Sequence, residues 1–194
     1  MLDLVQQETR RIESRFLEPA CGTGNFLIEI LDRKLNVVED RYKRSQSEYE
    51  RYAFLAISSL YGIDILQDNI KTCHNRLFYW LDEQYSSLFQ KKTKEAFREV
   101  IRYVLKKNIV LGDALTLQTI GSQPQPIVFA EWSFVRGNQI KRRDFAFREL
   151  LPEDTELPLF ATTTPQSDEG RSVFIPSPVK DYPLCHFIRI ADAD

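Results

Sequence analysis

Apolar residues recur at intervals of three and four along much of the chain, which is typical of helices with one buried face. This spacing predicts helices over residues 1–14, 25–38, 47–58, 68–84 and 93–105. Short apolar runs between them predict strands at residues 16–17, 60–65, 108–111 and 127–130. Strands that alternate with helices favour an α/β fold with a doubly wound, mostly parallel sheet.

The character of the chain changes after Leu151. Residues 152–194 contain six of the nine prolines, and their three Lys and Arg are outnumbered by eight Asp and Glu. We therefore predict one domain over residues 1–151, followed by a loosely structured, acidic, proline-rich arm over 152–194 with a short strand at 172–175.

Composition narrows the class of protein. No apolar run approaches the roughly 20 residues that span a bilayer, and the first 15 residues lack an apolar secretory core. Three cysteines give no disulfide framework, so we expect a cytoplasmic protein without a membrane partner. Residues 1–151 carry a net charge of +3, which is a weak signal for nucleic acid.

Residues 16–26 read F-L-E-P-A-C-G-T-G-N-F and contain the candidate chemistry. A strand that turns on two glycines into a helix presents backbone N–H groups and a helix N-terminus to a small ligand. A nicotinamide or flavin dinucleotide remains an alternative, although Leu27 stands where that motif has its third glycine. A purely structural turn that binds no ligand is a second alternative.

Two acids follow later strands. Asp64 ends the second predicted strand and Asp113 follows the third. Carboxyl ends of parallel strands share one edge of a doubly wound sheet, where ligands bind. Carboxylates there can accept hydrogen bonds from hydroxyl or amino groups of a ligand.

These three motifs, in this order, resemble S-adenosylmethionine-dependent DNA adenine-N6 methyltransferases of restriction–modification systems, over roughly residues 15–130. The resemblance implies a Rossmann-like class I methyltransferase fold and S-adenosylmethionine as cofactor. It places the glycine loop against the methionine part, Asp64 at the ribose, Ile65 on the adenine and Asp113 at the adenine amine. The implied cofactor residues are Glu18, Ala20, Cys21, Gly22, Thr23, Gly24, Asn25, Phe26, Asp64, Ile65, Asp113 and Ala114.

The catalytic motif of that family is degenerate here. The family carries Asn/Asp-Pro-Pro-Tyr/Phe after its fourth strand, whereas this chain has Glu131-Trp132-Ser133-Phe134 after its predicted fourth strand. Phe134 keeps the aromatic ring, and Glu131 is an acceptor for an amine proton. We interpret these two residues as the substrate-side, catalytic pair. Few residues remain for the later strands, so we expect a truncated form whose sheet is incomplete at one edge.

Two functions follow from this sequence. The first is a DNA adenine-N6 methyltransferase-like component of a restriction–modification system, with DNA as partner. The second is a non-catalytic module that binds cofactor or a partner, because an incomplete sheet exposes an edge to a second copy or another subunit. The basic cluster Lys141-Arg142-Arg143 contacts DNA phosphate in one interpretation and is a solvated face in the other. Cys73-His74 and Cys185-His186 lack the spacing of a zinc site.

Overall fold

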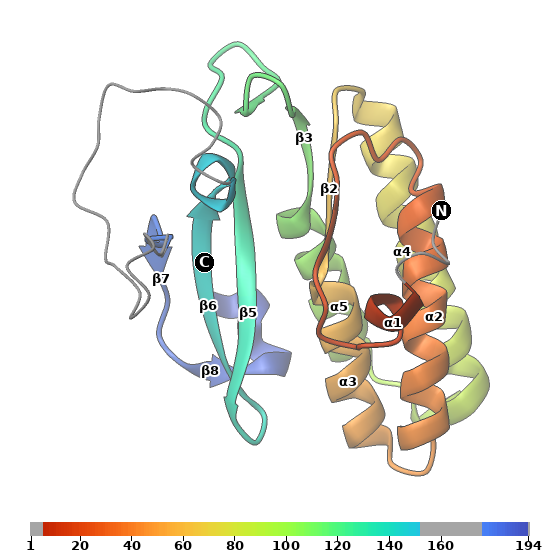
Figure 1. Cartoon of the computed structure of the whole chain (residues 1–194). Coiled ribbons are helices and arrows are strands. Elements are labelled where there is room, and N and C mark those ends of the chain that lie inside the picture. Colours follow the sequence, from red (N-terminus) through yellow and green to blue (C-terminus); the bar gives the residue numbers. More distant parts are fainter. Residues whose placement is uncertain (1–5, 152–175, 194) are drawn as a thin grey trace.

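The computed structural model describes residues 6–151 and 176–193 of the chain, which form an α/β fold with two four-stranded sheets (Figure 1). In the first sheet the order is β1-β2-β3-β4, with β1, β2 and β3 parallel and β4 antiparallel to β3. Its strands are β1 (Phe16–Glu18), β2 (Leu60–Asp64), β3 (Ile109–Asp113) and β4 (Gln118–Thr119). The predicted strands at 16–17, 60–65 and 108–111 are therefore confirmed.

Helices connect the parallel strands and lie on one side of the first sheet (Figure 1). α2 (Asn25–Tyr42) and α3 (Gln46–Ser58) connect β1 to β2, and α4 (Gln67–Phe89), η2 (Gln90–Lys92) and α5 (Glu95–Asn108) connect β2 to β3. The short α1 (Gln6–Thr9) precedes β1. Four predicted helices are confirmed with boundaries moved by a few residues. The helix predicted over 1–14 is wrong beyond Thr9, where turns lead directly into β1. No described helix is both long and apolar enough to cross a membrane.

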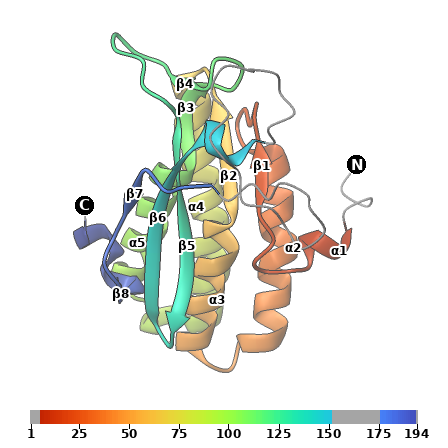
Figure 2. The ribbon, with the colours of Figure 1, turned by 60° about the vertical axis from the view of Figure 1, so that its left-hand side comes forward.

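The second sheet is built on an antiparallel hairpin. It contains β5 (Val128–Arg136), β6 (Gln139–Ala146), β7 (Lys180–Asp181) and β8 (Cys185–His186), with η3 (Phe147–Leu150) directly after β6. The hairpin turns at Gly137, whose φ is 55°. Figures 1 and 2 show β5 and β6 packed across the first sheet and the ends of α3 and α5.

The fourth strand is the main difference from the predicted fold. Residues 127–130 do not join the first sheet as a parallel strand; they enter β5, which pairs with β6 along its length. Apolar and polar residues alternate along β5, and Gly137-Asn138 supplies a two-residue turn, so a hairpin is the local solution. Among the described strands β1 pairs with β2 alone. The hairpin and the short η3, whose Phe147 packs with Tyr61 and Ile63, lie on the face of the sheet opposite the long helices.

The end of the chain is packed rather than loose over its described residues. β7 and β8 pair with β6, and η4 (Phe187–Ala193) buries Phe187 and Ile190. The ring of Phe187 makes edge contacts with Phe54 and Phe134. This apolar area holds residues 176–193 on the domain, so the expectation of a loose arm is wrong there. The strand predicted at 172–175 lies outside the described residues.

Side chains of β2 divide between the two layers. Leu60 belongs to the large core formed with the helices, while Tyr61 and Ile63 pack against Ile127 and Phe129 on the opposite face. The Tyr61 hydroxyl donates a hydrogen bond to the Ala130 carbonyl oxygen at 3.2 Å. Burial raises the pKa of Tyr61 to about 12, so this hydroxyl stays protonated and fixes the hairpin to the sheet.

A fully buried lysine joins α2 to the chain that enters β1. The Lys34 Nζ donates to the Ile12 carbonyl oxygen at 3.1 Å, to the Ser14 carbonyl oxygen and to the Ser59 hydroxyl. The Phe16 ring lies 5.1 Å from the same nitrogen. These three acceptors satisfy the donors of a side chain that would otherwise be costly to bury.

Lys34 should make the stability of the protein pH-dependent. Burial lowers its pKa to about 7 from an ordinary 10.5, while the charge of Glu13 opposes that shift. Between these values the unfolded chain holds a proton that the folded chain has released, so the free energy of unfolding rises with pH. The stabilisation is complete above 10.5 and is lost as the pH falls to 7. Urea unfolding at pH 7 and 9 should show a gain of about 2 kcal/mol that depends on Lys34.

Lys34→Met is the variant that tests this prediction, because it removes the titrating group and keeps an apolar stem. The exposed Lys43 provides the matched control, Lys43→Met, which should keep the wild-type pH dependence. A Lys34→Met protein with an unchanged difference between pH 7 and 9 would contradict the assignment.

Candidate functional site at the carboxyl ends of β1, β2 and β3

The glycine loop after β1 has the strand–turn–helix geometry that its sequence predicts. The Cys21 N–H donates to the Ile63 carbonyl oxygen at 2.9 Å, which holds the loop on β2. Gly22 and Gly24 have φ values of 53° and 85°, which side chains rarely adopt. The Gly24 carbonyl oxygen then accepts from the Ile28 N–H at 2.9 Å as α2 begins.

Gly24 also permits a close approach to α4. A Cβ atom at this position would lie 2.7 Å from the Cys73 sulfur, closer than real contacts allow. A Cβ on Gly62 of β2 would lie 3.1 Å from the Cys21 sulfur. The loop, β2 and α4 therefore meet closely at two buried thiols, with a definite clash for a side chain at position 24.

Cys21 is a structural residue of this loop. The hydrogen bond with the Cys73 thiol and burial both raise the pKa of Cys21 well above its ordinary value. A thiol that stays protonated is a poor nucleophile. Its role is to fill the space between the loop and α4.

The Asp64 carboxylate bridges the loop and the start of α4. Its Oδ2 accepts from the Gly22 N–H at 2.9 Å, and its Oδ1 accepts from the Leu66 N–H at 2.8 Å and the Asn69 side-chain amide at 3.0 Å. A carboxylate offers about four acceptor positions, so capacity remains for a ligand hydroxyl. Ile65 next to it is 59% exposed and presents an apolar surface suited to a ring.

Asp113 lies at the same end of the sheet as Asp64. Strands β2 and β3 are parallel, with Asp64 opposite Leu111 and Asp113 two residues further along. Asp113 Oδ1 accepts from the Leu115 N–H at 2.8 Å, which forms a tight turn after β3. The half-buried Ala114 lies within this turn, and Glu18 ends β1 on the other side of β2. The three strand ends thus bring the expected acids to one edge.

The structure adds Arg76, which the sequence reasoning missed. Its Nη1 donates to the Thr23 carbonyl oxygen at 2.8 Å, the Thr23 hydroxyl at 3.0 Å and the Asn25 side-chain oxygen at 2.7 Å. Arg76 stands three residues after Cys73 on α4 and so shares its face. No sequence pattern indicates this role of Arg76; the position follows once the contact of Cys73 with the loop is known. Thr23 and Asn25 are thereby held by a cation from α4.

Glu131 lies inside β5, not in a loop after a parallel strand. The Glu131 carboxylate forms ion pairs with Arg15 and, at 2.9 Å, with Arg143. Its side chain is only 15% exposed. Glu131 therefore faces two cations that satisfy its charge.

Phe134 lies further along β5 and packs in the core. Its ring contacts Phe54 and Phe187, each with centroids 5.7 Å apart. The Arg51 guanidinium covers it at 4.8 Å. The ring is engaged by three side chains, which limits its availability for stacking on a base.

The basic cluster of β6 is also engaged within the fold. Lys141 pairs with Asp181, and the buried Arg142 pairs with Asp144 at 2.8 Å. Arg143 pairs with Glu131, as described above. These ion pairs support a structural role over contact with DNA phosphate. Within the described residues no three His, Cys, Asp or Glu side chains gather as metal ligands do.

Comparison with known proteins gives one match. A family model for the DNA-methyltransferase domain of MmeI matches residues 2–139, which is 138 of the 194 residues. No curated protein and no solved structure matches the chain. The matched segment contains the glycine loop, Asp64, Asp113 and β5.

Substitution of Gly24 tests the close approach of the loop to α4. Gly24→Ala should lower the free energy of unfolding by about 1–3 kcal/mol, because it combines left-handed backbone strain with a clash against Cys73. The matched control is Gly121→Ala, since Gly121 is exposed and an added Cβ has nothing within 4 Å. The double variant Gly24→Ala/Cys73→Ala should recover the part due to the clash. Equal melting temperatures for the two single glycine variants would contradict the geometry.

Proposed function

The chain belongs to the family of the MmeI DNA-methyltransferase domain, and we propose that it binds S-adenosylmethionine at the carboxyl ends of β1, β2 and β3. The observation that carries this proposal is the convergence of the glycine loop, Asp64 and Asp113 at one sheet edge. The family is a restriction–modification methyltransferase family. We further propose that the first sheet is the half of a Rossmann-like class I methyltransferase fold that holds the cofactor, which its order and one-sided helices support.

The residues present fit the polar and apolar parts of the cofactor. Loop residues 18–26 would hold the methionine part, with Glu18 as the acid nearest the end of β1. Asp64 would accept from a ribose hydroxyl through the one position that its three intramolecular hydrogen bonds leave free. Ile65 and Ala114 would flank the adenine, and Asp113 would accept from its amine. When bound, the cofactor supplies a methyl group activated by a sulfonium.

Direct binding tests the site. Calorimetric titration of the wild type with S-adenosylmethionine should give saturable binding, and Asp64→Asn should raise Kd about tenfold or more, because the amide loses a charged acceptor. Asp113→Asn should weaken binding in the same direction. If the wild type does not bind S-adenosylmethionine, the proposed cofactor site is wrong.

The control for this titration is Asp68→Asn, which removes a neighbouring acid that is 97% exposed on the first turn of α4. It should bind as the wild type does. Because Asp64 also holds the loop, melting temperatures of all variants must accompany the titrations. Arg76→Gln, which loosens Thr23 and Asn25, should weaken binding while it leaves Asp64 in place.

We further propose that the chain is a DNA adenine-N6 methyltransferase-like component of a restriction–modification system, in which the motif that holds the substrate base is degenerate. Methylation of an exocyclic amine requires acceptors for the amine protons and a surface that holds the flipped base. Glu131 and Phe134 are the residues expected there. The second candidate is a non-catalytic cofactor- or partner-binding module, and the ion pairs of Glu131 with Arg15 and Arg143 favour it.

Transfer of a radiolabelled methyl group to DNA separates the two candidates. The ion pairs of Glu131 and the packing of Phe134 lead us to expect no incorporation by the chain alone. Incorporation at adenine N6 that is lost in Glu131→Gln would instead assign the substrate side to Glu131. Glu149→Gln, at a half-buried acid of η3, is the control that should not change the result.

A partner subunit or a second copy of the chain remains part of the second candidate. Among the described strands β1 has one neighbour, β2, so its other edge has backbone groups available for pairing. This edge is where a doubly wound sheet would place its next strand. Partners that supply such a strand would complete the sheet.

A further inference from the structure

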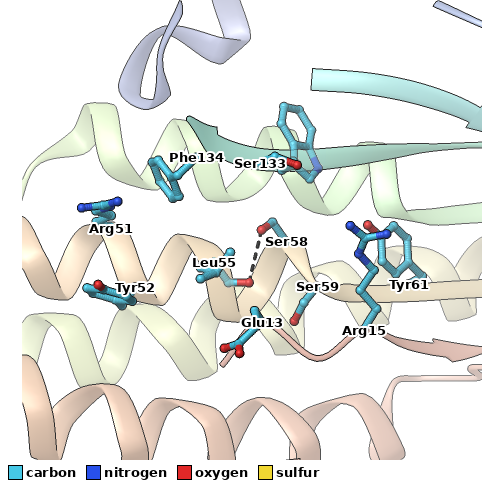
Figure 3. A pocket seen from close by; sticks show the side chains of 11 residues that line it. Glu13, Arg15, Arg51, Tyr52, Leu55, Ser58, Ser59, Tyr61, Ser133 and Phe134 are labelled. Carbon is cyan, nitrogen blue, oxygen red and sulfur yellow. Dashed lines mark hydrogen bonds between the residues drawn. The ribbon is translucent and has the colours of Figure 1, made fainter. Parts of the chain in front are cut away.

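A cavity of about 300 Å³ lies at the end of the sheet opposite to the proposed cofactor site. Glu13 and Arg15 line it just before β1, and Ser58 and Ser59 line it just before β2. Its other walls come from α3 and β5, as Figure 3 shows. The amino ends of the parallel strands thus border a second site, separate from Asp64 and Asp113 at their carboxyl ends.

Arg51 of α3 gives this cavity a positive charge. Its guanidinium lies 4.8 Å from the Phe134 ring centroid and 5.6 Å from that of Tyr52. Among the described residues no carboxylate pairs with it, and its buried Nε has no hydrogen-bond partner. Arg143 also has a buried Nε without a partner, but its Nη2 pairs with Glu131 and the Nε of Arg98 pairs with Asp82, each within 3 Å. Arg51 as a whole is half-buried, and a buried guanidinium nitrogen without an acceptor is destabilising unless water or a ligand supplies one.

The acids around the cavity do not neutralise Arg51. Glu13, the one acid among the lining residues, lies within ion-pair distance of Arg11, at 3.7 Å. The other lining arginine, Arg15, is engaged by Glu131. Counting the residues that the structure describes, the cavity therefore offers one cation, Arg51, without a paired carboxylate.

The remaining walls are aromatic and hydroxyl-bearing. Tyr52, Tyr61, Trp132 and Phe134 contribute rings, and Ser133 contributes a hydroxyl. The planar guanidinium fork matches the oxygens of a phosphate. The half-buried Tyr52 ring can stack on a planar heterocycle, while Tyr61, Trp132 and the already packed Phe134 ring give the cavity apolar walls. The volume suits a single small ligand.

We propose that this cavity binds a nucleoside phosphate, with Arg51 on the phosphate group and the aromatic walls around the base. The same chemistry occurs in a free nucleotide and in a nucleotide within a nucleic-acid strand. The site is independent of the S-adenosylmethionine site, since it lies at the other end of the sheet and shares no residue with it.

Fluorescence of Trp132 provides the test. In a Trp80→Phe background Trp132 is the one remaining tryptophan, and it lines the cavity. Thymidine 5′-monophosphate should quench it saturably at millimolar concentrations. Arg51→Met, which keeps an apolar stem over Phe134, should weaken binding about tenfold or more. Arg44→Met, at an exposed arginine before α3, should not.

Two further variants keep the test decisive. Arg51→Lys retains the charge without the planar fork and should weaken binding to an intermediate degree, which covers the case in which Arg51→Met fails to fold. Asp64→Asn should leave the quenching unchanged, so that failure of this proposal is distinguishable from failure of the cofactor proposal. Melting temperatures of each variant confirm folding.

The source of the phosphate is assigned by a parallel titration with single-stranded oligothymidylate. Quenching by the oligonucleotide alone, lost in Arg51→Met, would support the site and assign it to nucleic acid. Quenching by the mononucleotide would support it and assign it to a free ligand. No quenching by either, or equal binding by wild type and Arg51→Met, would overturn the proposal.

Discussion

The Asp64 carboxylate is the interaction on which the glycine loop depends. It accepts the Gly22 N–H on one side and the Leu66 N–H on the other, so one side chain at the end of β2 fixes both the loop and the start of α4. The left-handed conformations of Gly22 and Gly24 are held in place by this bridge and by the contact with Cys73. A loop held in this way needs little rearrangement to accept a ligand, which reduces the entropic cost of binding.

The β5–β6 hairpin decides what the rest of the chain can do. A loop after a parallel fourth strand would place its residues at the carboxyl edge, beside Asp64 and Asp113. The hairpin instead lies across the sheet, where Tyr61 donates to the Ala130 carbonyl oxygen. The residues that follow alternate between the arginines around Glu131 and the aromatic core around Phe134. The proposed cofactor site and the residues expected on the substrate side therefore lie in different layers of the fold.

Local patterns allowed most of the first sheet and its helices to be predicted. The spacing of Leu27, Ile30 and Leu31 predicted α2, and the two glycines predicted the turn before it. The helix and the turn could be predicted because each depends on residues that are neighbours in the sequence. The clamp of Arg76 on Thr23 joins residues 53 apart, so no local pattern contains it. Gly137-Asn138 between two strand-forming runs is a local hairpin signal, which the prediction of a parallel fourth strand did not use. The packing of Phe187 against Phe54 likewise depends on contacts distant in sequence.

The two ends of the first sheet carry opposite chemistry. At the carboxyl ends Glu18, Asp64 and Asp113 supply acceptors, which suit a ligand rich in hydroxyl and amino donors. At the amino ends the buried Lys34 and the unpaired Arg51 supply donors. Lys34 donates its hydrogen bonds to the Ile12 and Ser14 carbonyl oxygens and the Ser59 hydroxyl, and so stabilises the fold. The Arg51 guanidinium lies over aromatic rings, and within the described part of the chain no carboxylate pairs with it, so it is a cation at that end of the sheet that a ligand can use.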